Sequence, residues 1–202
     1  MLPASAVLPV RTIFCSLSLN QKNLDILLGN YLGLIKAAKI CGKSVPKWRV
    51  HHQLSGRKDL VLGKEVEVVN DGGTIEIGQR CSLLSGYQRL RLKVGKDATL
   101  TIGDDCILES VIIAASTSVS IGKACRLGPF VHIMDSDFHD LHDRSLPGPT
   151  APIHINDGVT LGARVIVLRG VTIGSGTQVL PGSVVTKDLP AGVFAAGVPE
   201  VL

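Results

Sequence analysis

Aliphatic residues recur at every sixth position along the C-terminal half of the chain, and smaller residues recur four positions after them. The first series is Ile155, Leu161, Val167, Ile173, Val179 and Val185, and the second is Val159, Val165, Val171, Thr177 and Ser183. A period of six matches neither a helix nor a simple strand, so each unit is expected to be a short strand followed by a corner. Three units close a triangular coil, and coils stack at about 4.8 Å. The first series should point inward, and the second should fill tight corners inside.

The first half of the chain shows the same pattern with less regularity. Four segments consist of an aliphatic residue, a glycine, two mostly polar residues and a small residue: "IGQRC" at Ile77, "VGKDA" at Val94, "IGDDC" at Ile102 and "IGKAC" at Ile121. The small position is occupied by Cys81, Cys106 and Cys125, which we therefore interpret as small interior residues rather than reactive thiols. The pattern slips phase around "CILESVII", so we expect the early coils to be less regular.

The segment 1–56 has a different character. Over residues 19–40 the apolar positions form one helical stripe, which predicts a helix, with Asn20 as its cap. The apolar start "MLPASAVLPVRTIFCSLSL" has no positive charge ahead of it and is broken by Arg11, so we expect neither a signal peptide nor a membrane span. The sequence thus predicts two parts, an N-terminal helical or irregular segment 1–56 and a repeat domain 57–202.

The stretch "IMDSDFHDLHDRSLPGPTAP" interrupts the repeats. Ile133 keeps the six-residue step, but the next in-phase residue is Ile155, a gap of 22 where 18 would complete a coil. The polar block 135–143 cannot line an aliphatic interior without a desolvation cost, so we expect a protruding loop over 135–152. A filled prism has no internal cleft, so a ligand site must lie outside it, with this loop as one wall and a neighbouring subunit as the other.

Composition and charge add further limits. Aromatic residues make up only 3% of the 202 residues, which suits narrow stacked coils. The segment 1–56 has seven Lys or Arg against Asp25 alone, so it would suit an anionic membrane surface or a phosphate-bearing substrate, although a solvated helix face is an equal reading. Five cysteines without a CxxC pair indicate neither a disulfide framework nor a thiolate metal site. We therefore expect a cytoplasmic protein, with no nucleic-acid partner.

Repeats such as "LGARVI", "VLRGVT" and "IGSGTQ" resemble the hexapeptide repeat of left-handed β-helix acyltransferases. The ending "VVTKDLPAGVFAAGVP" is similar to that of galactoside, maltose and polysaccharide O-acetyltransferases, and the resemblance covers roughly Ile77 to Pro199. It implies an all-β left-handed parallel β-helix, although parallel crossovers generally favour the right hand. It also implies a homotrimer that binds acetyl-coenzyme A between prisms, uses no metal, and acetylates a sugar hydroxyl of a glycan or its precursor in polysaccharide biosynthesis.

The resemblance places a general base in the protruding loop. The segment "DSDFH" is similar to the loop that carries the catalytic histidine in polysaccharide O-acetyltransferases, which points to His139, with His142 as the rival. Imidazole titrates near neutrality and can accept the proton of an attacking hydroxyl. A carboxylate could fix the ring tautomer; the candidates are Asp135, Asp137, Asp140 and Asp143.

The resemblance also implies a donor site formed by small residues and one cation. The expected residues are Gly162, Ala163, Pro181, Ser183, Thr186 and Lys187. Small residues let an extended chain lie against the coil, and Lys187 suits a coenzyme A phosphate. The sequence departs from the family where Pro181 replaces a small alanine and where the chain stops at "GVPEVL" before the expected arginines. Both departures bear on cofactor affinity.

Other functions stay open at the level of sequence. A metalloenzyme similar to γ-class carbonic anhydrases would use His132, His139 and His142 as ligands. A non-catalytic β-helix scaffold and an N-acetyltransferase for amino sugars are further alternatives. Metal content would separate the first of these, and thioester turnover would separate the second.

Overall fold

The structure is a computed structural model that describes residues 59–197 and 200–201. The predicted helix over 19–40 and the whole segment 1–56 lie outside the described residues. The part of the chain that the structure describes contains nineteen strands and no helix. Accordingly, none of the described residues belongs to a helix that could cross a membrane.

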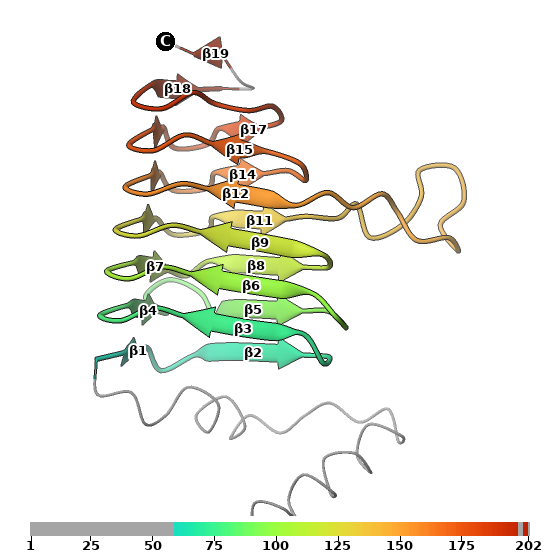
Figure 1. Cartoon of the computed structure of the whole chain (residues 1–202), viewed down its shortest axis with the longest axis horizontal. Coiled ribbons are helices and arrows are strands. Elements are labelled where there is room, and N and C mark those ends of the chain that lie inside the picture. Colours follow the sequence, from blue (N-terminus) through green and yellow to red (C-terminus); the bar gives the residue numbers. More distant parts are fainter. Residues whose placement is uncertain (1–58, 198–199, 202) are drawn as a thin grey trace, which may run out of the picture. The chain divides into compact units, whose positions relative to one another are not determined.

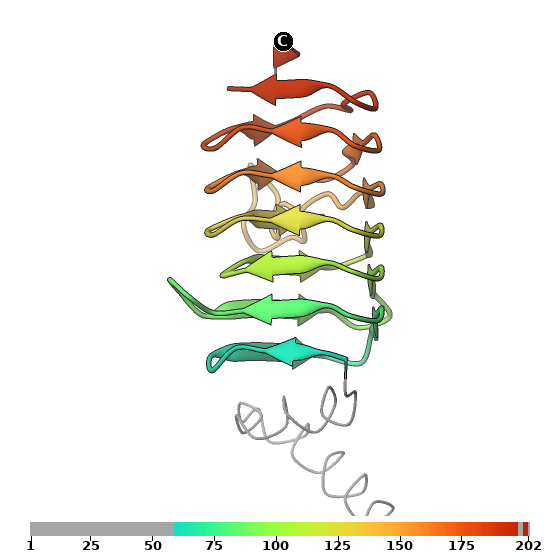
Figure 2. The same ribbon diagram turned by 90° about the vertical axis from the view of Figure 1, so that its left-hand side faces the viewer.

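The strands form three sheets that are the sides of a triangular prism, and about six coils stack along its axis (Figure 1, Figure 2). Sheet A contains β1 (Val61–Leu62), β4 (Ser82–Leu84), β7 (Ile107–Glu109), β10 (Arg126–Leu127), β13 (Thr160–Leu161), β16 (Gln178–Val179), β18 (Phe194–Ala196) and β19 (Glu200–Val201). Sheet B contains β2 (Val66–Asn70), β5 (Leu90–Val94), β8 (Ile112–Ala115), β11 (His132–Met134), β14 (Ile166–Val167) and β17 (Val184–Val185). Sheet C contains β3 (Thr74–Ile77), β6 (Thr99–Ile102), β9 (Ser118–Ile121), β12 (Ile153–Ile155) and β15 (Thr172–Ile173).

The chain passes through sheets A, B and C in turn, so neighbours within a sheet come from successive coils. Nearly all pairings are parallel; β19 instead pairs antiparallel with β18. The all-β, left-handed parallel β-helix expected from the sequence is confirmed. The corner where the chain passes from sheet A to sheet B is called the A/B edge. The corner where it passes from sheet B to sheet C is called the B/C edge.

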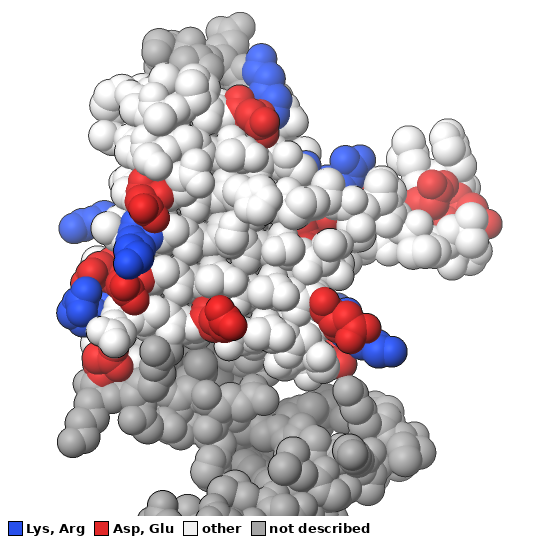
Figure 3. All heavy atoms as spheres, viewed as in Figure 1, with Lys and Arg blue, Asp and Glu red and all other residues white. Residues whose placement is uncertain are grey.

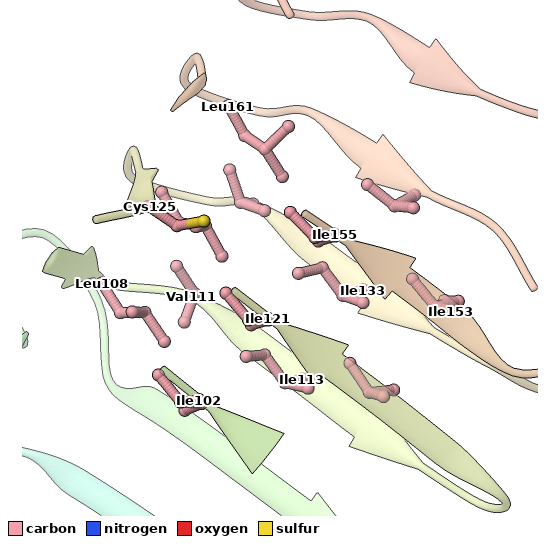
Figure 4. Close-up of a cluster of buried hydrophobic side chains, with 14 of the residues drawn as sticks. Ile102, Leu108, Val111, Ile113, Ile121, Cys125, Ile133, Ile153, Ile155 and Leu161 are labelled. Atoms are coloured by element: carbon pink, nitrogen blue, oxygen red, sulfur yellow. The ribbon is translucent and has the colours of Figure 1, made fainter. Parts of the chain in front are cut away.

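The six-residue pattern fills the prism interior as predicted. All residues of both series are at most 2% exposed, and Figure 4 shows members of the first series, Ile155 and Leu161, pointing inward from successive strands. Polar members of the second series are hydrogen-bonded inside: the Thr177 hydroxyl donates to the Pro190 carbonyl at 2.6 Å. The three repeat cysteines are 0% exposed, which confirms that they are interior residues.

The early coils are less regular, as expected. Strands β2 and β5 have five residues each, whereas β13 to β17 have two each. The phase slip in "CILESVII" falls at Ser110, which has φ 51° at the A/B edge. Its hydroxyl accepts hydrogen bonds from the backbone N–H groups of Tyr87 and Gln88 at 3.0 and 3.2 Å. The buried serine therefore joins two coils where the repeat loses its period.

The predicted loop leaves the prism at the B/C edge between β11 and β12 and projects well beyond the coils (Figure 1). A bridge between Ser136 and Thr150 closes its neck, and the Ala151 N–H donates to the Asp135 carbonyl at 3.0 Å. One boundary was wrong, because Asp135 and Ser136 are 0% and 8% exposed and stay in the prism wall. The part that projects begins at about Asp137.

Charged side chains gather along the edges of the prism, and the face formed by sheet C carries few of them (Figure 3). At the edge between sheets C and A, Arg80 pairs with Asp105 through two contacts of 2.6 Å. Outward positions of sheet C form a ladder that is mostly hydroxyl-bearing, in which Thr101, Ser120 and His154 lie in register.

Candidate active site

Asp135 fixes the base of the projecting loop. Its carboxylate accepts three backbone hydrogen bonds from the turn between β8 and β9 in the preceding coil, from Ser116 at 2.7 Å, Thr117 at 2.7 Å and Ser118 at 2.8 Å. Hydrogen bonds to an ionised acceptor are the strong ones, so this residue locks the loop to the coil below. It is therefore an anchor and not a carboxylate that can orient a histidine.

The backbone of His139 is held in one place by two contacts. Its N–H donates to the Asp137 carbonyl at 2.7 Å across Phe138, which has φ 62°, and together these residues form a γ-turn. A Cβ placed on Gly148 would lie 2.5 Å from the His139 carbonyl oxygen, so only glycine lets the returning arm of the loop pack there. A non-glycine residue held at positive φ stores backbone strain, and such strain clusters at functional sites.

The ring of His139 is exposed. It makes no hydrogen bond to any residue in the described range 59–197. A rigid backbone that carries a free imidazole is what a general base for an external substrate requires.

His142 lies in the tip of the same loop, in a different setting. Its backbone N–H and that of Asp143 donate to the Asp140 carboxylate at 2.8 and 3.0 Å. The N–H groups of Asp143 and His142 hold the pKa of Asp140 below its usual value. The hydroxyl and N–H of Ser145 do the same for the pKa of Asp143. Both carboxylates are thus used to shape the loop tip.

Asp137 ties the loop to the coil above. Its carboxylate accepts from Arg169 Nε at 2.9 Å, and both side chains are about half exposed. Arg169 follows β14 at the B/C edge and was not singled out in the sequence. Asp137, expected to assist the base, forms no hydrogen bond or ion pair with the ring of His139 within the described part of one chain.

The residues expected at the donor site lie along two different edges of the prism. Gly162, Ala163 and Pro181 stack at the A/B edge, where a Cβ on Gly162 would lie 2.7 Å from Pro181 Cδ. Thr186 and Lys187 follow β17 at the B/C edge and are exposed. Lys187 forms no ion pair with any described residue. The two groups are separated by the width of sheet B, so one chain does not bring all of them together.

Ser183 differs from the other donor-site candidates. It is 2% exposed, and its hydroxyl donates to the Leu180 carbonyl at 2.7 Å while accepting from the Gly197 N–H at 3.1 Å. Both hydrogen-bonding capacities of the hydroxyl are therefore used inside the prism. Its side chain is not presented to a ligand.

The outer face of sheet B between these edges is apolar in its upper coils. Most outward residues of its ladders are apolar, namely Ile112, Ala114, Met134, Ile166 and Val184, and His132 lies between Ile112 and Ile166. The loop also carries apolar side chains in the open, with Phe138 49%, Leu141 86% and Leu146 54% exposed. An apolar face beside an apolar loop is typical of an interface.

Histidines outside the loop show no convergence on it. His132 lies in β11 on the outer face of sheet B, and His154 Nδ1 is 2.8 Å from the Ser120 hydroxyl on sheet C. Within the residues that the structure describes, no three His, Cys, Asp or Glu side chains of one chain are grouped to hold a metal ion.

Two important residues were not found by reading the sequence, Gly148 and Arg169. Gly148 stands between two prolines in the sequence, but its close approach to His139 depends on how the two arms of the loop meet. Arg169 sits in a repeat corner, where any polar residue fits the pattern. Only the pairing of coil and loop reveals its partner.

Comparison with known proteins confirms the resemblance. No protein-family model matches the sequence. Galactoside O-acetyltransferase of Escherichia coli strain K12 is 35% identical over 128 residues, which are 63% of this chain and 52% of that protein. The 2,3,4,5-tetrahydropyridine-2,6-dicarboxylate N-acetyltransferase of Clostridium perfringens strain SM101 is 49% identical over 53 residues, which are 26% of this chain and 22% of that protein.

A solved structure supports the fold independently. A hexapeptide-repeat acetyltransferase from Vibrio cholerae superposes with a TM-score of 0.52 at 20% identity, covering 88% of this chain and 90% of that chain. In the sequence matches, the chain spans about half the length of the first relative and about a fifth of the second. The activity of the chain is therefore argued from the site.

Proposed function

We propose that the protein is an acetyl-coenzyme A-dependent O-acetyltransferase that acts on a sugar hydroxyl, with His139 as general base. The observation that carries the proposal is the placement of His139 on a constrained backbone with an exposed, unengaged ring. The similarity of 128 residues to a galactoside O-acetyltransferase gives the same reaction class.

The reaction needs a base and no enzyme nucleophile. Bound acetyl-coenzyme A supplies an activated thioester. His139 accepts the proton of the acceptor hydroxyl as its oxygen bonds to the acetyl carbon, and the carbon–sulfur bond breaks. The same ring returns the proton to the departing sulfur, so atoms and charges balance. The exposed ring, with both nitrogens free of described partners, suits this exchange.

The donor site is proposed at the A/B edge. Gly162, Ala163 and Pro181 offer a smooth column against which an extended pantetheine arm can lie. Lys187 lies at the B/C edge, so the copy that offers this unpaired cation to a coenzyme A phosphate would be the neighbouring one. Pro181 contributes no N–H, which leaves the adjacent carbonyls and corner N–H groups as the polar contacts. We expect the hydroxyl of Ser183 to support the corner from inside.

The complete site requires a second copy of the chain. His139 projects from the B/C edge, while most donor-site residues lie at the A/B edge across sheet B. Packing of the apolar upper face of sheet B and of Phe138, Leu141 and Leu146 against a neighbour would bring the loop of one copy to the A/B edge of the next. A closed ring of three copies satisfies this head-to-tail contact, so we propose a homotrimer.

The acceptor and the setting extend the proposal. We propose that the acceptor is a sugar hydroxyl of a glycan or glycan precursor. The protein would then act in polysaccharide biosynthesis, in the cytoplasm. The basic segment 1–56 is proposed to approach anionic lipid or substrate. An amino sugar acceptor would make the product an amide, as in the relative that is an N-acetyltransferase.

The test is acceptor-dependent release of coenzyme A thiol from acetyl-coenzyme A by the full chain, over a panel of sugars, nucleotide sugars and oligosaccharides. We expect His139→Ala to lose at least about a hundredfold in kcat, as typical for removal of a general base. His142→Ala is the matched control in the same loop and should keep activity. Loss with His142→Ala and not with His139→Ala would move the base, and no release with any acceptor would refute the proposal.

A further inference from the structure

The aromatic residues of the repeat domain lie outside its interior. None of the four aromatic side chains in residues 59–197 belongs to the buried core, and Tyr87 is 70% exposed. Aromatic side chains usually contribute large buried areas to a core, so their exclusion from this one needs another explanation. Two of them, Tyr87 and Phe130, lie together at the A/B edge.

Tyr87, Phe130 and Arg164 form a strip along the A/B edge, in which the coil between Tyr87 and Phe130 contributes Ser110. The rings of Tyr87 and Phe130 are 6.2 Å apart at 42°, and the Arg164 guanidinium lies 5.8 Å from the centre of the Phe130 ring. Corner hydrogen bonds hold these coils in line, because Phe130 N–H donates to Ser110 and Arg164 N–H donates to Pro129. The strip is therefore a fixed feature of the edge.

Arg164 is kept at this corner despite its backbone conformation. It has φ 60°, whereas every other described residue with positive φ from 158 to 197 is a glycine. The left-handed conformation costs a non-glycine residue roughly 1–2 kcal/mol. Ser110 and Phe130, at earlier corners of the same edge, also have positive φ, so the feature that distinguishes Arg164 is its position over the Phe130 ring.

A groove of about 180 Å³ lies beside the strip on the outer side of sheet A. It is lined by Ile107, Glu109, Arg126, Gly128 and Thr160 among others. The carboxylate of Glu109 lies close to Gly86, the residue before Tyr87, since a Cβ on Gly86 would lie 3.1 Å from its Oε1 atom. The edge thus combines ring faces with a carboxylate acceptor and two guanidinium donors.

This combination fits a sugar ring. A pyranose has an apolar face of C–H groups that packs on an aromatic ring, and a rim of hydroxyls that both donate and accept hydrogen bonds. Tyr87 and Phe130 offer the ring faces, Glu109 accepts, and Arg126 and Arg164 donate. One carboxylate beside two guanidinium groups provides both acceptors and donors, which matches a sugar rim whose hydroxyls do both.

We infer that the Tyr87–Phe130–Arg164 strip and the groove beside it are the platform for the acceptor's pyranose ring. The inference rests on the proposed function. Arg164 directly follows Ala163 of the proposed donor site, so a sugar on the strip lies next to the donor along one edge. The strip then selects ring-shaped acceptors, while His139 of a neighbouring copy reaches the hydroxyl.

The test measures binding without turnover. Saturation-transfer NMR on the full chain, with free galactose, glucose, N-acetylglucosamine and their disaccharides and without acetyl-coenzyme A, detects sugars that lie on aromatic protons. In the wild type we expect saturation transfer to the C–H protons of one sugar face. In Tyr87→Ala this transfer should be lost, because the dissociation constant of the sugar should rise about tenfold, in line with the energy of one aromatic contact. Phe194→Ala is the matched control, an aromatic residue 50% exposed in β18, and should keep the signal.

The outcomes separate this inference from the proposed function. Equal transfer in Tyr87→Ala and wild type, transfer to no sugar, or transfer to adenosine alone would each overturn the platform. Acceptor-dependent thiol release is measured separately, so it can persist when the platform is refuted. Conversely, sugar binding that Tyr87→Ala abolishes upholds the platform even in a protein that releases no thiol.

Discussion

Replacing Asp135 by alanine removes the acceptor of three part-buried hydrogen bonds at once and tests the account of the loop base. Each hydrogen bond to an ionised group contributes about 1.5–3 kcal/mol net. Because Ser116 and Thr117 are exposed, water can reach two of the three freed N–H groups, so the lower end of the range applies. We expect Asp135→Ala to lower the free energy of unfolding by about 3–5 kcal/mol, as when one partner of a buried charged contact is removed.

Two further variants make this prediction specific. Asp135→Asn keeps one acceptor oxygen but turns an NH₂ group toward an N–H donor, so it should lose roughly half as much, about 2 kcal/mol. Asp157→Ala is the matched control, because its exposed carboxylate accepts one backbone hydrogen bond, from Lys123 at 2.7 Å; it should cost about 1 kcal/mol or less. Urea unfolding followed by far-UV circular dichroism gives all three values.

The reasoning would fail in two ways. A loss below about 1 kcal/mol in Asp135→Ala would mean that the three bonds do not hold the loop to the coil. An Asn variant as stable as wild type would mean that charge does not matter there. Either result would also weaken the argument that His139 stands on a fixed base.

Three other predictions follow from the described contacts. Gly148→Ala should lower kcat at least about tenfold, because the added Cβ displaces the His139 backbone, with little change in the free energy of unfolding. Gly95→Ala is the control: its Cβ would have its nearest atom at 3.4 Å, so kcat and the free energy of unfolding should both stay unchanged. The thiols of the three repeat cysteines, 0% exposed, should resist labelling until the protein is unfolded, as peptide mass spectrometry would show. The pKa of Asp140 is lowered in the folded loop, so its contribution to loop order is present above its ordinary value of 3.8 and lost as pH falls through the folded value. The protection factors of the loop-tip amides, which compare their exchange with that of an unfolded chain at the same pH, should fall there and stay constant at higher pH.

The regular part of this protein could be predicted from its sequence because each coil is built from the same local residue pattern. An aliphatic residue every six positions, and a small residue four later, define a coil whose interior can be filled in only one way. Ile155, Thr177 and Cys125 are therefore buried where the pattern places them. The chain also showed where the pattern must fail, since 22 residues cannot close a coil of 18.

The tertiary structure decided what the irregular residues do, because their partners come from other coils. Asp135 was grouped with the projecting acids, yet it is buried against the turn of the preceding coil. Ser183 was expected to contact the cofactor, yet its hydroxyl forms its hydrogen bonds inside the prism. A repeat fixes which residues face inward by local geometry, whereas a contact across coils, such as Gly148 against His139, depends on how a loop returns.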